Sequence, residues 1–256
     1  MTSVYTSAHV RYADREAVIA AIRRLEPTAE EPIAVWPPRP LPLGIFVGPP
    51  HNGWVGVWSM LGDTAELLQR LSATLECTGL LFQIHGDRWW CLVVYQDGHY
   101  VARYDSPFEE ALEGELEAQA AENLEAQGID PDDDPEALER EIERLLDLPE
   151  FGEELARRAA AQDDLTPLLP LLTPFSSPDD LRPLLVVEAE ALEADDFVDE
   201  LAEEFASHLG LRDVAWDPNA DRDELAEGDY GDLDFLPSDF PGFVLIPVRR
   251  LPLLGE

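Results

Sequence analysis

The sequence predicts an α+β protein built on an antiparallel sheet, with an acidic helical region and a late C-terminal strand. Three observations lead to this prediction. Turn-forming dipeptides divide residues 79–104 into three short apolar segments, a pattern typical of a β meander. Segments on both sides of that meander carry apolar residues at helical spacing. The last apolar segment, residues 243–249, is rich in β-branched residues.

The dipeptides Gly86-Asp87 and Asp97-Gly98 set the register expected for the meander. Two-residue turns pair the residues that flank them, so His85 is expected opposite Arg88. Side chains alternate along a strand, and the register therefore predicts which of them share a face. The expected core face holds Leu80, Phe82, Ile84, Trp89, Cys91, Val93, Tyr95, Tyr100, Ala102 and Tyr104. The expected outer face holds Gln83, His85, Arg88, Trp90, Leu92, Val94, His99, Val101 and Arg103.

The rest of residues 1–106 is expected to complete this sheet as an α+β core. Residues 5–13, 40–50 and 53–60 have the aromatic and β-branched content of strands. Asp14 stands at the N-cap position of a helix. Leucines at helical spacing between residues 64 and 75 predict a second helix.

Residues 107–256 are expected to form an acidic, mainly helical region. Helix-forming residues dominate segments 107–127, 134–148, 149–162 and 197–209, each with a narrow apolar stripe. Residues 166–178 predict an apolar, proline-containing linker that packs against the protein. The final strand at 243–249 is expected to pack back on the core.

The negative charge is concentrated in this second region. The formal net charge is −37, and all 17 basic residues are arginine. Up to Ser106 there are 11 Asp/Glu against 8 Arg, net −3, whereas the later residues have 43 against 9, net −34. A field of this sign repels phosphate, so direct binding to nucleic acid or to an anionic membrane is not expected.

The sequence predicts a cytoplasmic location. No apolar run reaches the ~18 to 20 residues of a membrane span, and the N-terminal residues lack the order of a signal peptide. Cys77 and Cys91 both lie in apolar surroundings, which predicts two buried thiols and not a disulfide.

Common catalytic and cofactor motifs are absent from the sequence. There is no GxSxG, phosphate-binding glycine loop, HExxH or CxxC. Residues 130–141 come nearest to a calcium-binding loop, but Pro135 stands where the EF-hand requires glycine. We therefore predict no cofactor, no metal site and no catalytic residue.

The outer face of the meander is the candidate partner-binding surface. An exposed tryptophan flanked by arginines is a composition that protein interfaces favour. The candidate residues are Gln83, His85, Arg88, Trp90, His99 and Arg103. An alternative is that helices of the acidic region cover this face, which would make Trp90 a core residue.

Several functions agree with these features. The first is non-catalytic binding or sequestering of a basic protein partner, since charge asymmetry steers association. A second is a small-molecule or metal-dependent enzyme around His85 and His99, although both histidines stand beside turns, where polar residues are common. A salt-adapted protein of unrelated function and a nucleic-acid mimic are further alternatives. The oligomeric state is not predicted.

The run DxWWxxxxYxDGxYVxRYDS, residues 87–106, resembles compact α+β modules of bacterial accessory and immunity-type proteins. This resemblance implies protein binding, in agreement with the first function.

Overall fold

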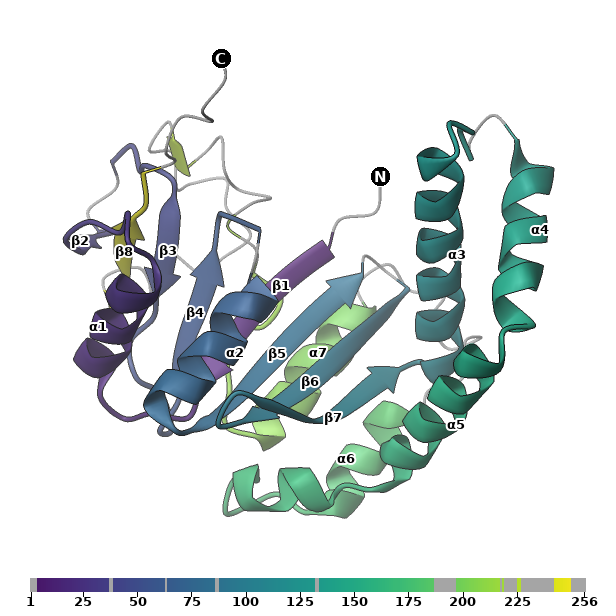
Figure 1. Ribbon diagram of the computed structural model, residues 1–256. Coiled ribbons are helices and arrows are strands. Elements are labelled where there is room, and N and C mark those ends of the chain that lie inside the picture. The colour runs from purple at the N-terminus through teal and green to yellow at the C-terminus, as the bar shows by residue number, and fades with distance from the viewer. Residues whose placement is uncertain are drawn as a thin grey trace.

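The structure, a computed structural model, confirms the predicted α+β class. It describes residues 4–36, 39–62, 64–85, 88–131, 134–186, 197–216, 218, 225–226 and 242–249. Figure 1 shows one large twisted sheet with helices on both faces and further helices beyond one edge.

The sheet has eight strands, and each described pair of neighbours is antiparallel. Across the sheet the order is β2 (Ile33–Ala34), β8 (Val244–Pro247), β3 (Gly44–Val47), β4 (Val55–Ser59), β1 (Val4–Val10), β5 (Thr78–His85), β6 (Trp89–Gln96) and β7 (His99–Ser106). The expected late strand therefore forms, and it inserts between β2 and β3. The division of the chain at residue 106 stays a prediction.

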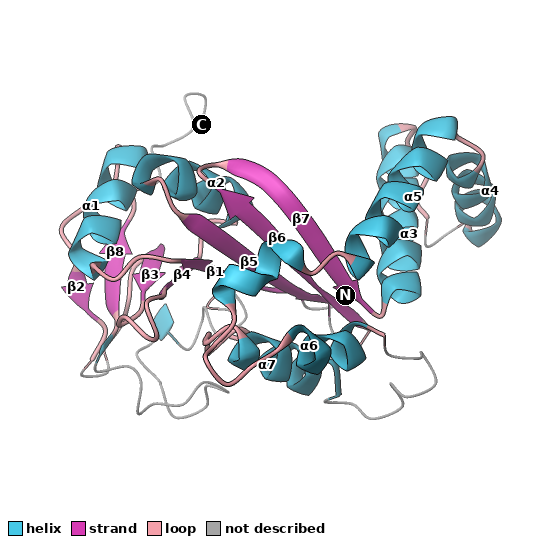
Figure 2. Ribbon diagram, turned by 90° about the horizontal axis from the view of Figure 1, so that it is seen from below, coloured by secondary structure: helices cyan, strands magenta, loops and turns pink. Residues whose placement is uncertain are grey.

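Helices cover both faces of the sheet. Figure 2 shows α1 (Arg15–Leu25) and α2 (Thr64–Leu75) on one face, and α6 (Pro178–Leu185) and α7 (Phe197–His208) on the other. Beyond the β7 edge lie α3 (Phe108–Ala126), α4 (Pro135–Leu146) and α5 (Pro149–Asp163). The short 3-10 helix η1 (Thr166–Leu171) follows α5, and its buried Leu168 and Leu171 confirm that this linker packs against the protein.

Short-range signals determine the ends of several helices. The Asp14 carboxylate accepts the backbone N–H groups of Glu16 and Ala17 at 3.0 and 3.3 Å, as predicted for the N-cap of α1. Asp134 caps α4 in the same way. Gly210 follows α7 with a φ of +74°, a left-handed conformation that glycine adopts without a steric penalty.

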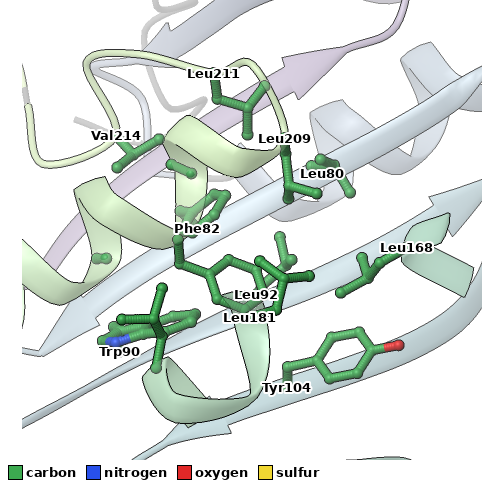
Figure 3. Close-up of a cluster of buried hydrophobic side chains, with 14 of the residues drawn as sticks. Leu80, Phe82, Trp90, Leu92, Tyr104, Leu168, Leu181, Leu209, Leu211 and Val214 are labelled. Atoms are coloured by element: carbon green, nitrogen blue, oxygen red, sulfur yellow. The ribbon is translucent and has the colours of Figure 1, made fainter. Parts of the chain in front are cut away.

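One face of the meander packs against the C-terminal helices. Phe82 and Trp90 contact Phe205 of α7, with ring centroids 6.5 and 4.9 Å apart. Leu181 of α6 and Leu168 of η1 complete the same cluster, as Figure 3 shows. Apolar burial of this kind is the main favourable term in folding, so residues beyond 163 contribute to the core of the sheet.

The other face of the meander is also apolar. Leu81, Cys91 and Val93 pack there with side chains of α1 and α2, such as Ile22 and Leu71. Both faces of β5 and β6 are therefore buried, which explains why these two strands have nearly continuous apolar sequences and little alternation.

The predicted faces are right for β5 and for Ala102 and Tyr104 of β7 but wrong for β6. Tyr100, predicted on the core face, lies opposite Tyr95 and is 43% exposed. His85 pairs with Trp89 and not with Arg88, so three residues and not two connect β5 to β6; the expected two-residue turn at 86 and 87 lies outside the described residues. This one-residue shift turns Trp90, Leu92 and Val94 toward Leu80, Phe82 and Ile84.

A β-bulge between β6 and β7 compensates for this one-residue shift. Gln96 does pair with His99, as predicted, but the register shifts between Val94 and Tyr95. Val94 consequently lies opposite Ala102, and the later part of β7 returns to the expected face. Neither the longer connection nor the bulge has a clear signal in the sequence.

Both cysteines are free and buried, as predicted. Cys91 nevertheless lies on the face opposite to the predicted one. Within the part of the chain that the structure describes, no helix combines the length and the apolar character needed to cross a membrane.

The buried position of Trp90 leads to a stability prediction. Its side chain is 0% exposed and contacts Phe82 and Phe205, so Trp90→Ala should lower the free energy of unfolding by about 3 to 5 kcal/mol. Urea denaturation followed by circular dichroism measures this change. Val101→Ala, on an exposed side chain of the same sheet, is the control and should cost less than about 1 kcal/mol. An equally small loss for Trp90→Ala would contradict the packing described above.

Candidate functional site

The six residues predicted as a partner-binding set do not form one surface. Gln83, His85 and Arg103 share one face of the meander, with Arg88 at the adjoining strand end. Trp90 points to the opposite face and is fully buried, so its predicted role as an accessible anchor is wrong, and the core alternative holds for this side chain.

His99 lies far from His85. His99 pairs with Gln96, which pairs with Thr78 at the start of β5, whereas His85 is the last residue of that strand. Seven steps of about 3.3 Å separate the two ends of β5, roughly 23 Å. The two histidines therefore cannot act on one substrate or hold one metal ion, and the predicted histidine pair is wrong.

His85 is part of a partly buried aromatic stack. Its ring lies parallel to that of Trp89, with centroids 3.5 Å apart and an interplanar angle of 13°. Burial, together with the positive charge of Arg103, lowers the pKa of His85 to about 4, so the ring is neutral at pH 7. Its Nε2 atom has no hydrogen-bond partner among the described residues.

Next to this stack lies a group of four charged side chains, Arg103, Asp105, Glu115 and Arg158, which we call the Arg103 cluster. Arg103 Nε donates to Asp105 Oδ1 at 2.7 Å, and Arg158 Nη2 donates to Asp105 Oδ2 at 2.8 Å. Both arginines also pair with Glu115, Arg158 at 2.5 Å. Each carboxylate thus bridges both guanidinium groups, and the four side chains form a closed ring of ion pairs.

The Arg103 cluster is charge-balanced and largely shielded from water. Asp105 is 0% exposed, and the side chain of Arg158 is 7% exposed. Burial by itself lowers the pKa of Arg103, but the nearby Cys91, Asp105 and Glu115 more than reverse that effect. The guanidinium therefore stays charged, and the cluster holds two positive and two negative groups.

The cluster joins three elements that are distant in sequence. Arg103 and Asp105 belong to β7, Glu115 belongs to α3 and Arg158 belongs to α5. Since each charged group already has two partners, the cluster is suited to joining helices to the sheet and not to binding a substrate. Asp105, Glu115 and Arg158 were not predicted as site residues. The one signal in the sequence is the spacing of Arg103 and Asp105, since residues two positions apart in a β-strand lie on the same face.

Helices α3, α4 and α5, residues 108–163, form what we call the acidic arm. These residues include 20 Asp/Glu against 4 Arg, net −16. Among the arm residues whose exposure the structure describes, eleven carboxylate residues are exposed: Glu113, Glu122, Glu125, Asp130, Asp134, Glu136, Glu139, Glu143, Asp147, Glu153 and Asp163. Figures 1 and 2 show α3 and α4 side by side, away from the centre of the sheet.

The arm has a small apolar core of its own. Leu116, Ala120 and Leu145 are buried between α3 and α4, with Leu138 and Ile142 packed against them. Glu141 faces Arg144 and Asn123, and these hydrogen bonds lower its pKa to about 2. Glu141 is thus occupied within the arm, and the described residues contain no group of three or more His, Cys, Asp or Glu that could hold a metal ion.

A second polar site lies around His9 in the central strand. His9 is buried, its Nε2 lies 3.3 Å from Ser7 Oγ, and its ring makes edge contacts with Trp58 and Phe82. The adjoining cavity, which His51 and Asp213 also line, has a volume of about 10 Å³. This is room for about one water molecule and not for a substrate.

Comparison of the chain with protein-family models, with curated proteins and with solved structures gives no match. Any functional proposal therefore depends on the charge and geometry of the arm and the sheet.

The burial of His9 predicts a pH dependence of stability. Burial lowers the pKa of His9 from 6.5 to about 3, so between these values the unfolded state binds more protons than the folded state. The contribution of neutral His9 to the free energy of unfolding should be complete above pH 6.5. It should fall by about 4 kcal/mol as the pH is lowered to 3.

Urea denaturation across this pH range tests the effect by comparing wild type with His9→Gln. The stability difference between the two proteins should shrink or reverse as the pH falls. His99→Gln, which removes an exposed histidine, should follow the wild-type profile more closely. A difference between wild type and His9→Gln that stays constant from pH 7 to pH 3 would contradict a buried neutral His9.

Proposed function

We propose that this protein is a non-catalytic binding protein whose acidic arm docks a basic protein partner. The observation that supports this proposal is the position of the charge. Eleven exposed carboxylates lie in the described part of the arm, at the edge of the sheet, while other helices cover the two faces of that sheet.

The packing of the arm agrees with a surface used for binding. A helix that serves only to cover a core has a broad apolar face, whereas the apolar contacts within α3 and α4 are confined to a few leucine, isoleucine and alanine side chains. Most of the remaining surface of these helices is exposed to solvent and carries charged side chains. Elements with this composition are suited to long-range attraction of an oppositely charged molecule.

The chemistry of the arm selects the class of partner. A net charge of −16 over 56 residues attracts arginine-rich and lysine-rich surfaces and repels phosphate groups. The proposed partner is therefore a basic protein and not a nucleic acid or an anionic membrane. Carboxylates on the partner's binding surface would oppose docking, so a basic patch is required.

Two sets of substitutions with equal charge test the proposal. The arm variant carries Glu113→Gln, Glu122→Gln, Glu125→Gln, Glu139→Gln and Glu143→Gln. The control variant carries Glu16→Gln, Glu76→Gln, Asp179→Asn, Glu200→Gln and Glu204→Gln, all at exposed positions outside the arm. Both variants change the net charge from −37 to −32, so only the location of the lost charge differs.

Wild-type protein immobilised on beads should capture a basic protein from an extract of the source cells at near-physiological salt. The control variant should capture it as well, and the arm variant should associate about tenfold more slowly or worse, with a weaker salt dependence. Surface plasmon resonance measures the association rate constants. Equal losses in both variants would show that the overall charge matters and not the arm. Absence of any specific capture would favour salt adaptation.

A further inference from the structure

We infer that the Arg103 cluster is a polar latch that holds α5 against the β7 edge of the sheet, and that removing one of its charges releases α5 while the sheet stays folded. The inference follows from the contacts of α5 and is independent of the proposed partner binding.

Polar groups make the described contacts between α5 and β7. Of the α5 side chains that the structure describes, Arg158 is the one that is buried, and it pairs with Asp105. Gln162 Nε2 donates to the main-chain oxygen of Asp105 at 3.0 Å. Arg157 lies over the ring of Tyr100, 5.5 Å from its centroid. Asp105 is therefore the centre of this attachment, through both its side chain and its backbone.

The latched state leaves some polar groups unsatisfied. Arg158 Nε and Gln162 Oε1 are buried without a hydrogen-bond partner among the described residues. Both atoms would regain hydrogen bonds to water if α5 moved away from the sheet, which lowers the cost of opening. The cost of removing buried charges from water offsets much of the attraction within such ion pairs.

Opening would leave the principal core clusters in place. The meander packs against α1 and α2 on one face and against α6 and α7 on the other, and no described α5 side chain belongs to either cluster. The first turns of α3 stay with the sheet, because Ala111 is buried there and Gly114 lies against Trp89. The moving part is thus α5, because α4 packs against α3 through Leu145, Leu116 and Ala120.

The latch also protects an edge of the sheet. β7 is an edge strand of eight residues. The main-chain oxygen of Asp105 faces α5. In an antiparallel strand the N–H and C=O of one residue point to the same side, so those of Asp105 and, by alternation, Arg103 are directed away from β6. An uncovered edge of this kind can pair with a second strand, and α5 lies where it prevents such pairing.

Pulsed electron paramagnetic resonance on the full chain tests the latch. Spin labels at Ala160→Cys on α5 and Thr74→Cys on α2 occupy exposed positions, while the native Cys77 and Cys91 are buried and react slowly. In the labelled protein with a wild-type latch we expect one narrow distance distribution. Asp105→Asn should broaden it toward longer distances, and amide exchange at Arg103 should rise about tenfold or more while β1 and β5 amides stay protected.

Glu117→Gln is the matched control. Glu117 lies on α3, as Glu115 does, and pairs with Arg88 at 2.9 Å. Both side chains of this pair are about 40% exposed, so this variant should keep the narrow distance distribution. A folded Asp105→Asn protein with an unchanged distribution would overturn the latch. If Asp105→Asn unfolds, Glu115→Gln, at a carboxylate that is 34% exposed, decides: a broadened distribution supports the latch, and an unchanged one or global unfolding contradicts it.

Discussion

The fold depends on one constraint: the central strands of the sheet are apolar on both faces, and each face has to be covered. In β5, Phe82 and Ile84 point to one side while Leu81 points to the other, and all three are buried. A single layer of helices satisfies only half of this requirement. The chain places α1 and α2 on one face and returns more than 100 residues later to place α7 on the other.

This two-sided packing also determines where the charge can lie. Carboxylates are costly to bury without a partner, and the sheet and its covering helices leave few such places. Asp105 is a carboxylate that does enter the interior, and two arginines pair with it. Many of the remaining carboxylates lie on the solvent-facing surfaces of α3, α4 and α5. The arm is thus a region in which charge can accumulate without disturbing the core, which is the physical basis of its proposed role in binding.

Local signals in the sequence are sufficient for much of the fold. The cap at Asp14, the three meander strands, the helices between residues 108 and 163 and the late strand at Val244–Pro247 all follow from patterns within a few residues. The face of β6 does not, since it depends on one additional residue in the connection after His85. Trp90 and Cys91 exchange sides for this reason.

The candidate site was less predictable because its members meet only in the folded chain. Asp105 and Arg158 are 53 positions apart, and nothing in the acidic helices distinguishes Arg158 from neighbouring Arg157 except the face on which it lies. The histidine pair failed for the opposite reason, since residues that flank two successive turns of a meander lie at opposite ends of the sheet. Sequence spacing alone therefore indicates the acidic arm but not its attachment.

The acidic arm is peripheral to the sheet, since Ala111 is the one described apolar residue of the arm that lies in the clusters on the two sheet faces. Native-state hydrogen exchange on the full chain tests this claim most directly, residue by residue. Amides of β1 and β5 should exchange only through global unfolding, with the largest free energies in the protein. Amides of α4 should exchange through a local opening that costs several kcal/mol less. Equal protection of α4 and β5, with the same dependence on denaturant, would show that the arm and the sheet unfold as one unit and that the arm is not peripheral.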